Sequence, residues 1–207
     1  TAYITNQPGN HSYVDFFAMQ GDEHHPIRKE LRKTKRRLYD SDMLPYLSRL
    51  MESDHAKLFV VLHTYGSHFS YRDRYPKEEG FFPIDRRYSG SKADSLMLRN
   101  AYDNAIRQTD KFITSVIDLL ASGDRAASML YISDHGEDVF DDDRERFLHS
   151  SPDVSYYQLH VPLLLWSSPS WREAHPHLFA SARANEREAI SSNAVFHTLL
   201  ELAGIRT

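Results

Sequence analysis

The sequence contains no cysteine, and it has only 8 glycines and 9 prolines in 207 residues. The absence of cysteine excludes disulfide bonds, cysteine-ligated zinc and thiol catalysis, and it leaves the redox compartment open. The small share of glycine and proline excludes collagen-like and low-complexity chains. Because 41% of the residues are hydrophobic and 12% are aromatic, the chain can bury a sizeable core and is not intrinsically disordered.

Long apolar segments and a dominant charge are also missing. The longest uninterrupted apolar runs are Leu58–Leu62 and Val161–Trp166, whereas a membrane-spanning helix needs about 20 such residues. The 25 basic and 29 acidic side chains give a net charge of −4, so we expect no nucleic acid as a partner. The chain has no signal peptide and starts at Thr1, from which we expect a processed or trimmed piece.

Apolar periodicity predicts one α/β unit. Leu98, Tyr102, Ala105 and later apolar residues step by three and four along a long helix from about Ser95 to Ser122. The expected strands are short continuous apolar runs, at Lys57–His63, Ala127–Ser133 and Val161–Ser168. Shorter helices are expected at Asp42–Ser53 and Asn193–Ala203. The succession of strand, long helix and strand is typical of a βαβ unit with parallel strands.

Two polar clusters come directly after predicted strands, and histidine, with 12 residues, is unusually frequent. The clusters are His63–His68 and Ser133–Glu137. Ligands of open α/β sheets bind beyond the carboxyl ends of the strands, so we expect both clusters at one edge. Asp134 and His135 combine a carboxylate with an imidazole, a donor pair that suits zinc, with manganese as second choice. The alternatives are a plain Asp-His-Gly turn and a surface loop with two solvated histidines.

Three other polar stretches carry weaker signals. His149 lies fourteen residues beyond His135 and is a third candidate histidine. The acidic run from Glu137 to Glu145 lacks the spacing and glycine of an EF-hand, so we expect a solvated loop. The basic run Arg28–Arg37 could meet anionic lipid headgroups, and the alternative is an ordinary exposed helix or loop.

Several sequence blocks, in order along the chain, carry a family resemblance. Y-I-T-N-Q, L-H-T-Y-G-S-H-F-S-Y-R-D-R-Y-P, N-A-Y-D-N-A-I-R-Q-T-D, L-Y-I-S-D-H-G-E-D with F-L-H-S, and H-V-P-L-L-L-W-S cover most of its length. Their residues and their order resemble the C-terminal half of the phosphoethanolamine transferases. These enzymes modify lipid A of lipopolysaccharide and related envelope sugars, and they belong to the alkaline phosphatase/sulfatase superfamily.

The resemblance implies a fold and a set of site residues. The fold would be an α/β three-layer sandwich with a mostly parallel sheet, of which residues 1–207 form the C-terminal portion of a single sulfatase-like catalytic domain. Asp134 and His135 would ligate the catalytic zinc, and His68 and His149 would hold a second zinc or the substrate phosphate. His63 matches a further motif histidine whose role stays open.

The family mechanism and location follow from the same resemblance. A zinc-activated threonine attacks phosphatidylethanolamine, and phosphoethanolamine then passes from the phospho-threonine to lipid A or another envelope sugar. The parent enzyme would be anchored in the bacterial inner membrane, with this domain in the periplasm. The threonine and an acidic metal ligand of the family lie upstream of this sequence, since Thr5 and Thr64 stand in other motifs. No catalytic nucleophile is therefore assigned, and the isolated piece should be inactive.

Two alternatives to this function remain open. A sulfatase or a phosphoglycerol transferase of the same superfamily would share the Asp-His pair, but a sulfatase needs an upstream C/S-x-P-x-R element. A non-catalytic domain that binds anionic lipid or glycan would instead depend on the basic run Arg28–Arg37.

Overall fold

The structure is a computed structural model that describes residues 1–8, 13–34, 37–149 and 153–205. These residues group into two compact units. One unit comprises Thr1–Val116 and Val139–Leu148, and the other comprises Ile117–Asp138 and His149–Thr207. No helix within the described ranges is both long enough and apolar enough to cross a bilayer.

A three-stranded parallel sheet organises the first unit. Its order is β2 (Glu23–Pro26), β1 (Ala2–Thr5) and β3 (Val60–His63), and both pairings are parallel. In this register Thr5 lies opposite both Pro26 and His63, so the three strands end together at one edge. The segments that follow β1 and β3 therefore leave the sheet side by side.

Short helices accompany this sheet. They are α1 (Tyr13–Ala18), α2 (Ile27–Leu31) and α3 (Leu44–Met51), the last preceded by a 3-10 turn at Asp40–Met43. Leu47 and Leu50 are buried on one face of α3, together with Met43 of the turn. The expected helix Asp42–Ser53 is thus present but shorter.

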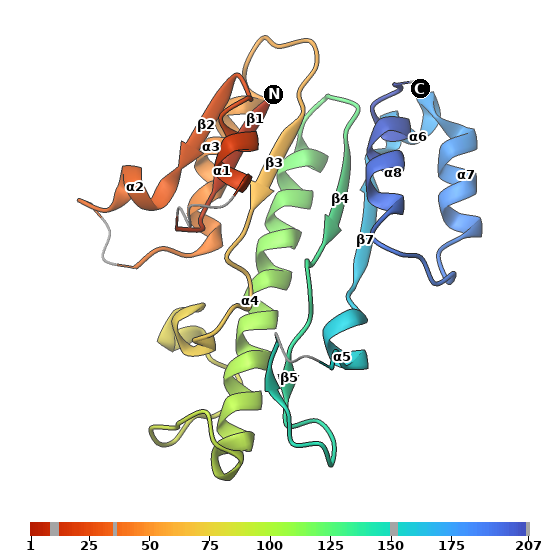
Figure 1. Cartoon of the computed structure of the whole chain (residues 1–207). Helices are drawn as coiled ribbons and strands as arrows, with labels where there is room; N and C mark the ends of the chain where they lie inside the picture. Colours follow the sequence, from red (N-terminus) through yellow and green to blue (C-terminus); the bar gives the residue numbers. More distant parts are fainter. Residues whose placement is uncertain (9–12, 35–36, 150–152, 206–207) are drawn as a thin grey trace. The chain divides into compact units, whose positions relative to one another are not determined.

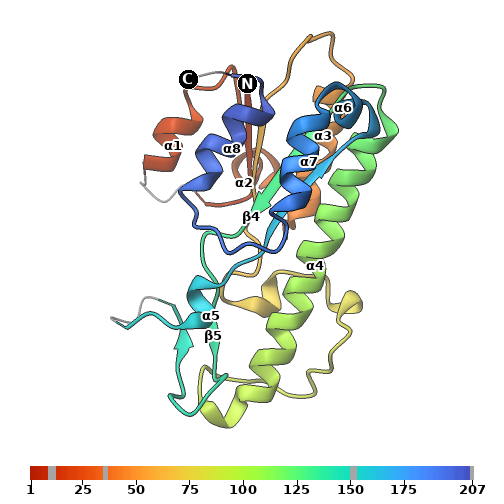
Figure 2. The ribbon, with the colours of Figure 1, turned by 90° about the vertical axis from the view of Figure 1, so that its right-hand side faces the viewer.

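The long helix α4 (Ser95–Ser122) has the predicted bounds, and both views show it as one continuous helix (Figures 1 and 2). Leu98, Ala101 and Ala105 of α4 form a buried cluster with Tyr71 and Tyr75. A small two-stranded hairpin, β5 (Asp138–Val139) and β6 (Phe147–Leu148), adds Val139 to this cluster.

One polar residue of α4 holds a loop that has no regular structure of its own. Asn104 is buried, and its Oδ1 accepts hydrogen bonds from the backbone N–H groups of Phe81 and Phe82 at 2.8 and 2.9 Å. Its Nδ2 donates to the carbonyl of Phe82 at 2.9 Å. The side chain therefore supplies hydrogen bonds to backbone groups of a segment that has no helix or strand partner to do so.

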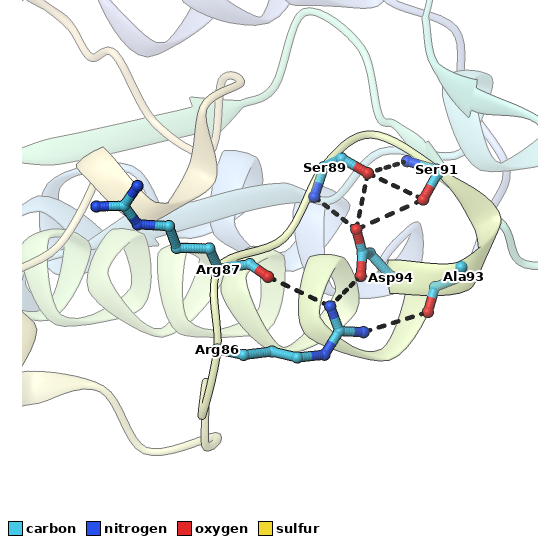
Figure 3. A network of polar contacts seen from close by, with 6 residues as sticks. All are labelled: Arg86, Arg87, Ser89, Ser91, Ala93 and Asp94. Carbon is cyan, nitrogen blue, oxygen red and sulfur yellow. Dashed lines mark hydrogen bonds and ion pairs between the residues drawn. The ribbon is translucent and has the colours of Figure 1, made fainter.

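The start of α4 is fixed by a carboxylate network around Asp94 (Figure 3). Asp94 Oδ2 accepts hydrogen bonds from the backbone N–H of Ser89 at 2.6 Å and from its hydroxyl at 2.7 Å, and Oδ1 forms an ion pair with Arg86. The N–H and then the hydroxyl of Ser89, followed by the guanidinium of Arg86, lower the pKa of Asp94 to about 2. The network ties the preceding loop to the first turn of the helix.

The second unit contains a two-stranded antiparallel sheet. β4 (Ser128–Ile132) pairs with β7 (Leu163–Ser167), with Ser128 opposite Ser167 and Ile132 opposite Leu163. The helices of this unit beyond α4 are α5 (Tyr156–Leu159), α6 (Pro169–Ala174), α7 (Pro176–Ala184) and α8 (Ala194–Leu202). The two expected strands and the C-terminal helix are present, each shorter than predicted.

Burial of β7 differs from the expectation. The continuous apolar run Val161–Ser168 predicts a buried strand, but Leu163 and Leu164 are 36% and 39% exposed. β7 has one hydrogen-bonded neighbour, β4, among the described strands. Successive side chains of a strand point to opposite faces of the sheet, so each face of β7 carries an exposed apolar side chain.

Candidate metal centre

Three potential metal ligands gather in the second unit. His135, Glu137 and His149 each offer one donor atom, and these atoms all lie within 4.8 Å of one another. The ring centroids of the two histidines are 3.8 Å apart, and His149 Nδ1 lies 3.1 Å from Glu137 Oε1. The Glu137 side chain is 4% exposed, whereas those of His135 and His149 are 33% and 31% exposed. The group therefore combines a buried carboxylate with two solvent-accessible imidazoles.

The backbone after β4 is held tightly where it presents His135. The hydroxyl of Ser133 donates to the carbonyl of His135 at 2.7 Å, and the N–H of Gly136 donates to the carbonyl of Gln158 at 2.9 Å. A Cβ at position 136 would lie 2.0 Å from the carbonyl oxygen of Tyr157. Glycine is thus required here because another backbone segment approaches closely.

The hydrogen bonds of His135 indicate which ring nitrogen could bind a metal. Its Nδ1 lies 2.9 Å from the carbonyl oxygen of Gly136, and a carbonyl can only accept. Nδ1 therefore carries the proton, and Nε2 keeps its lone pair. Asp134 Oδ2 lies 3.8 Å from that Nε2. Two ligands about 2.0–2.2 Å from one zinc ion can be that far apart, so the pair fits a shared ion.

His149 is oriented by a carboxylate. Its Nδ1 can donate to Glu137 Oε1 at 3.1 Å, an arrangement that fixes the ring and supports metal binding through the other nitrogen. Together, imidazole nitrogens and carboxylate oxygens form a donor set that fits zinc, with manganese as the poorer match.

His63 and His68 lie in the first unit and have contacts of their own there. His63 ends β3, and its Nδ1 lies 3.1 Å from Thr5 Oγ1. His68 is exposed, and its ring meets that of Tyr65 edge to face at a centroid distance of 5.2 Å. Of the predicted site residues, the structure thus brings together His135 and His149, with Asp134 next to His135.

Sequence reasoning missed the residue that holds the loop after β3. Asp40 is buried, and its Oδ1 accepts hydrogen bonds from the N–H of Tyr65 at 2.8 Å and from Asn6 Nδ2 at 2.9 Å. Its Oδ2 accepts from the N–H of Gly66 at 2.9 Å. Asp40 lies 25 residues before Tyr65, and no local pattern links the two.

The acidic run was predicted as a solvated loop, and this prediction is wrong for its first two residues. Glu137 and Asp138 are both buried, and Asp138 Oδ2 accepts a hydrogen bond from Gln158 Nε2 at 2.5 Å. Burial of these carboxylates is possible because each has a hydrogen-bond partner. Asp141, Asp143 and Glu145 are exposed as expected.

Comparisons with known proteins give a consistent result. Residues 1–205 match the family described as Sulfatase. Over 99% of its length the chain is 31% identical to phosphoethanolamine transferase CptA of Salmonella typhimurium, of which the match covers 36%. The chain therefore spans about a third of the length of the curated relatives it matches.

Solved structures agree with this match. The C-terminal periplasmic domain of EcEptC from Escherichia coli, in complex with Zn, gives a TM-score of 0.74 at 27% identity, covering 84% of this chain and 50% of that chain. A second match is the integral membrane protein lipooligosaccharide phosphoethanolamine transferase A (EptA) from Neisseria meningitidis. Its TM-score is 0.81 at 25% identity, and the match covers 97% of this chain and 38% of that chain.

These findings confirm three predictions from the sequence. The ordered motifs do resemble phosphoethanolamine transferases, and the α/β fold class of the alkaline phosphatase/sulfatase type is correct for this partial domain. The relatives are named as transferases, so an enzyme family was also correctly expected. With a match that extends over residues 1–205, the chain belongs to the sulfatase family.

Proposed function

We propose that residues 1–207 are the C-terminal portion of the single catalytic domain of a zinc-dependent phosphoethanolamine transferase. The enzyme would move phosphoethanolamine from phosphatidylethanolamine to lipid A or another envelope sugar. The observation that carries the proposal is the gathering of His135, Glu137 and His149, within 4.8 Å, in the segment that resembles the family's metal motif. The similarity to two phosphoethanolamine transferases supports the same reaction.

Each site residue has a proposed role. Asp134 and His135 hold the catalytic zinc, through the carboxylate and Nε2 that lie 3.8 Å apart. His149, oriented by Glu137, binds the substrate phosphate or a second zinc. His63, the last residue of β3, and His68, in the loop that follows, are proposed for the same role. Zinc, when bound, lowers the pKa of a coordinated hydroxyl and neutralises charge on phosphoryl oxygens.

The nucleophile is proposed to be a threonine upstream of Thr1, which then forms the phospho-threonine intermediate. Residues 1–207 in isolation would lack this nucleophile and would not transfer phosphoethanolamine. We also propose that the parent protein is anchored in the bacterial inner membrane and that this domain faces the periplasm. The periplasmic location of the E. coli domain and the membrane nature of the Neisseria relative support this placement.

The proposal is tested in the full-length protein. Asp134→Ala and His135→Ala should each abolish transfer of phosphoethanolamine from a labelled phosphatidylethanolamine to lipid A, and a chelator should do the same until zinc is restored. His177→Ala is the matched control, because His177 is an exposed histidine of α7 in the same unit. Full transfer by the two variants would contradict the proposal.

The same assay separates the two alternatives. Zinc-dependent cleavage of a sulfate ester, without transfer from phosphatidylethanolamine, would identify a sulfatase. Tight binding of anionic vesicles that survives both chelation and His135→Ala, with no turnover, would identify a non-catalytic lipid-binding domain.

A further inference from the structure

Two arginines converge on one tyrosine in the first unit. The Cζ atom of Arg74 lies 3.8 Å from the centroid of the Tyr65 ring, and that of Arg28 lies 4.6 Å from the same centroid. All three residues are half-buried. Arg28 belongs to α2, Tyr65 follows β3, and Arg74 follows the 3-10 turn Tyr71–Asp73, so three separate segments build this cluster.

Each guanidinium is oriented through its Nε. Arg28 Nε donates to the carbonyl of Asn6 at 2.5 Å, and Arg74 Nε donates to the carbonyl of Ser70 at 3.3 Å. Within the described ranges, the two terminal nitrogens of each guanidinium have no hydrogen-bond partner and can bind another group. Among the residues that the structure describes, no carboxylate lies within 4.0 Å of either group to form an ion pair.

Some other arginines of this unit do have such partners. Arg37 lies 3.6 Å from Asp73, and Arg86 is paired with Asp94. Stacking on an aromatic ring explains one arginine at Tyr65, but it does not explain two positive charges on one ring without a matching carboxylate.

The electrostatic setting of Arg74 favours an added anion. Burial lowers the pKa of Arg74, and the nearby charge of Arg28 also lowers it, while Tyr65, Asp73 and Asp40 act in the opposite direction. The Asp40 carboxylate accepts three hydrogen bonds from N–H groups, and among the described residues it forms no ion pair with Arg28 or Arg74. An anion bound between the arginines would offset the cost of burying two like charges.

The cluster also lies where a ligand is expected. β1 and β3 end at the same edge of the parallel sheet, with Thr5 opposite His63, and Tyr65 comes two residues later. Ligands of open α/β folds bind beyond this edge. Tyr65 in turn contacts the ring of His68 edge to face, so the arginines adjoin a residue already proposed to bind substrate.

We propose that Arg28 and Arg74, held in place by Tyr65, form a binding site for a phosphate group of a substrate. Planar guanidinium groups bind phosphate through two parallel hydrogen bonds, which suits the free terminal nitrogens of both residues. The identity of the substrate rests on the proposed function. The phosphate is carried either by the headgroup of the donor phospholipid or by the acceptor sugar.

The first experiment measures binding of inorganic phosphate to the full-length protein by calorimetry. A chelator is present, so that a metal ion cannot bind the phosphate. Arg28→Ala and Arg74→Ala should each weaken binding about 10- to 100-fold, as expected for loss of charge-assisted hydrogen bonds. Arg28→Lys and Arg74→Lys should weaken it less, because lysine keeps the charge but loses the planar pair of donors.

A matched control is available in the same unit. Arg49 stacks on a single tyrosine, with its Cζ 5.2 Å from the centroid of Tyr46, and it is exposed. Arg49→Ala removes the same charge and the same type of contact, and it should leave phosphate binding unchanged. The melting temperature of each variant shows whether it is folded, and the lysine variants replace any alanine variant that is not.

A second experiment identifies the source of the phosphate. With zinc restored, the arginine variants should raise KM either for the phospholipid donor or for the acceptor sugar phosphate. If the variants lose phosphate binding but the wild type transfers nothing, the anion site stands and the proposed transferase function fails. The anion site is overturned if wild type does not bind phosphate, or if all four variants bind it within about two-fold of wild type.

Discussion

Removal of the Asp40 carboxylate should free the loop that follows β3. This carboxylate accepts three hydrogen bonds of 2.8–2.9 Å, from Asn6 and from the N–H groups of Tyr65 and Gly66. Hydrogen bonds to a charged group contribute about 1.5–3 kcal/mol each. Because Tyr65 and Gly66 are only half-buried, water can partly replace the lost partner. We therefore expect Asp40→Ala to destabilise the loop by about 3–4 kcal/mol.

Hydrogen exchange of the Tyr65 and Gly66 amides in the full-length protein measures this effect directly. A loss of about 3 kcal/mol corresponds to local exchange that is about 100-fold faster. Asp40→Asn should increase the exchange rate less. The oxygen of the new amide can still accept a hydrogen bond, whereas its NH₂ group lies opposite an N–H donor and cannot accept from it. Asp85→Ala is the control, because it removes an exposed carboxylate from the same unit. Wild-type exchange rates at both amides in Asp40→Ala would refute the reasoning.

Two further predictions concern the metal centre and the start of α4. Gly136→Ala would place a Cβ 2.0 Å from the carbonyl oxygen of Tyr157, so we expect the free energy of unfolding to fall by about 1–3 kcal/mol and bound zinc to be lost. Gly21→Ala is the control and should have neither effect, because the nearest atoms to its Cβ would be 3.5 Å away. Zinc analysis and melting curves check this, and normal zinc content in Gly136→Ala would contradict it. The pKa of Asp94 is about 2 in the folded protein, below its ordinary value of 3.8, so the stability from this group is complete above pH about 4 and is lost as the pH falls towards about 2. The difference in melting temperature between wild type and Asp94→Asn should shrink over that range, and a constant difference would exclude this role.

Local pattern was sufficient for much of the fold. The helix Ser95–Ser122 was predicted with its observed bounds because its apolar residues repeat over 28 residues and no proline interrupts them. The three strands expected at Lys57–His63, Ala127–Ser133 and Val161–Ser168 are present but shorter, since an apolar run can extend beyond the residues that pair with a neighbour. The polar strand β2 was not predicted, because it has no such run. The pairing partners of the strands were not predictable in the same way, because pairing depends on contacts remote in sequence. The antiparallel pairing of β7 with β4 is an example.

The candidate site was predicted only where local sequence marks it. Asp134, His135 and His149 stand in recognisable motifs, and His135 and His149 do lie together. Glu137 belongs to an acidic run whose members look alike in sequence, and only the folded structure separates this buried residue from its exposed neighbours. Arg28 was equally hidden in the sequence. It begins a basic run but contacts Tyr65, whereas Lys29, Arg32, Lys33 and Arg37 are exposed to solvent.

The contacts of Asn104 have a consequence for the order of folding. The loop at Phe81 and Phe82 obtains its hydrogen bonds from this one side chain of α4, with distances of 2.8–2.9 Å. Helical structure depends on local contacts and forms quickly, whereas the loop must close across 22 residues to reach Asn104. We therefore expect the loop to dock after the turn of α4 that carries Asn104 has formed, so that the helix serves as the template on which the preceding segment acquires its conformation.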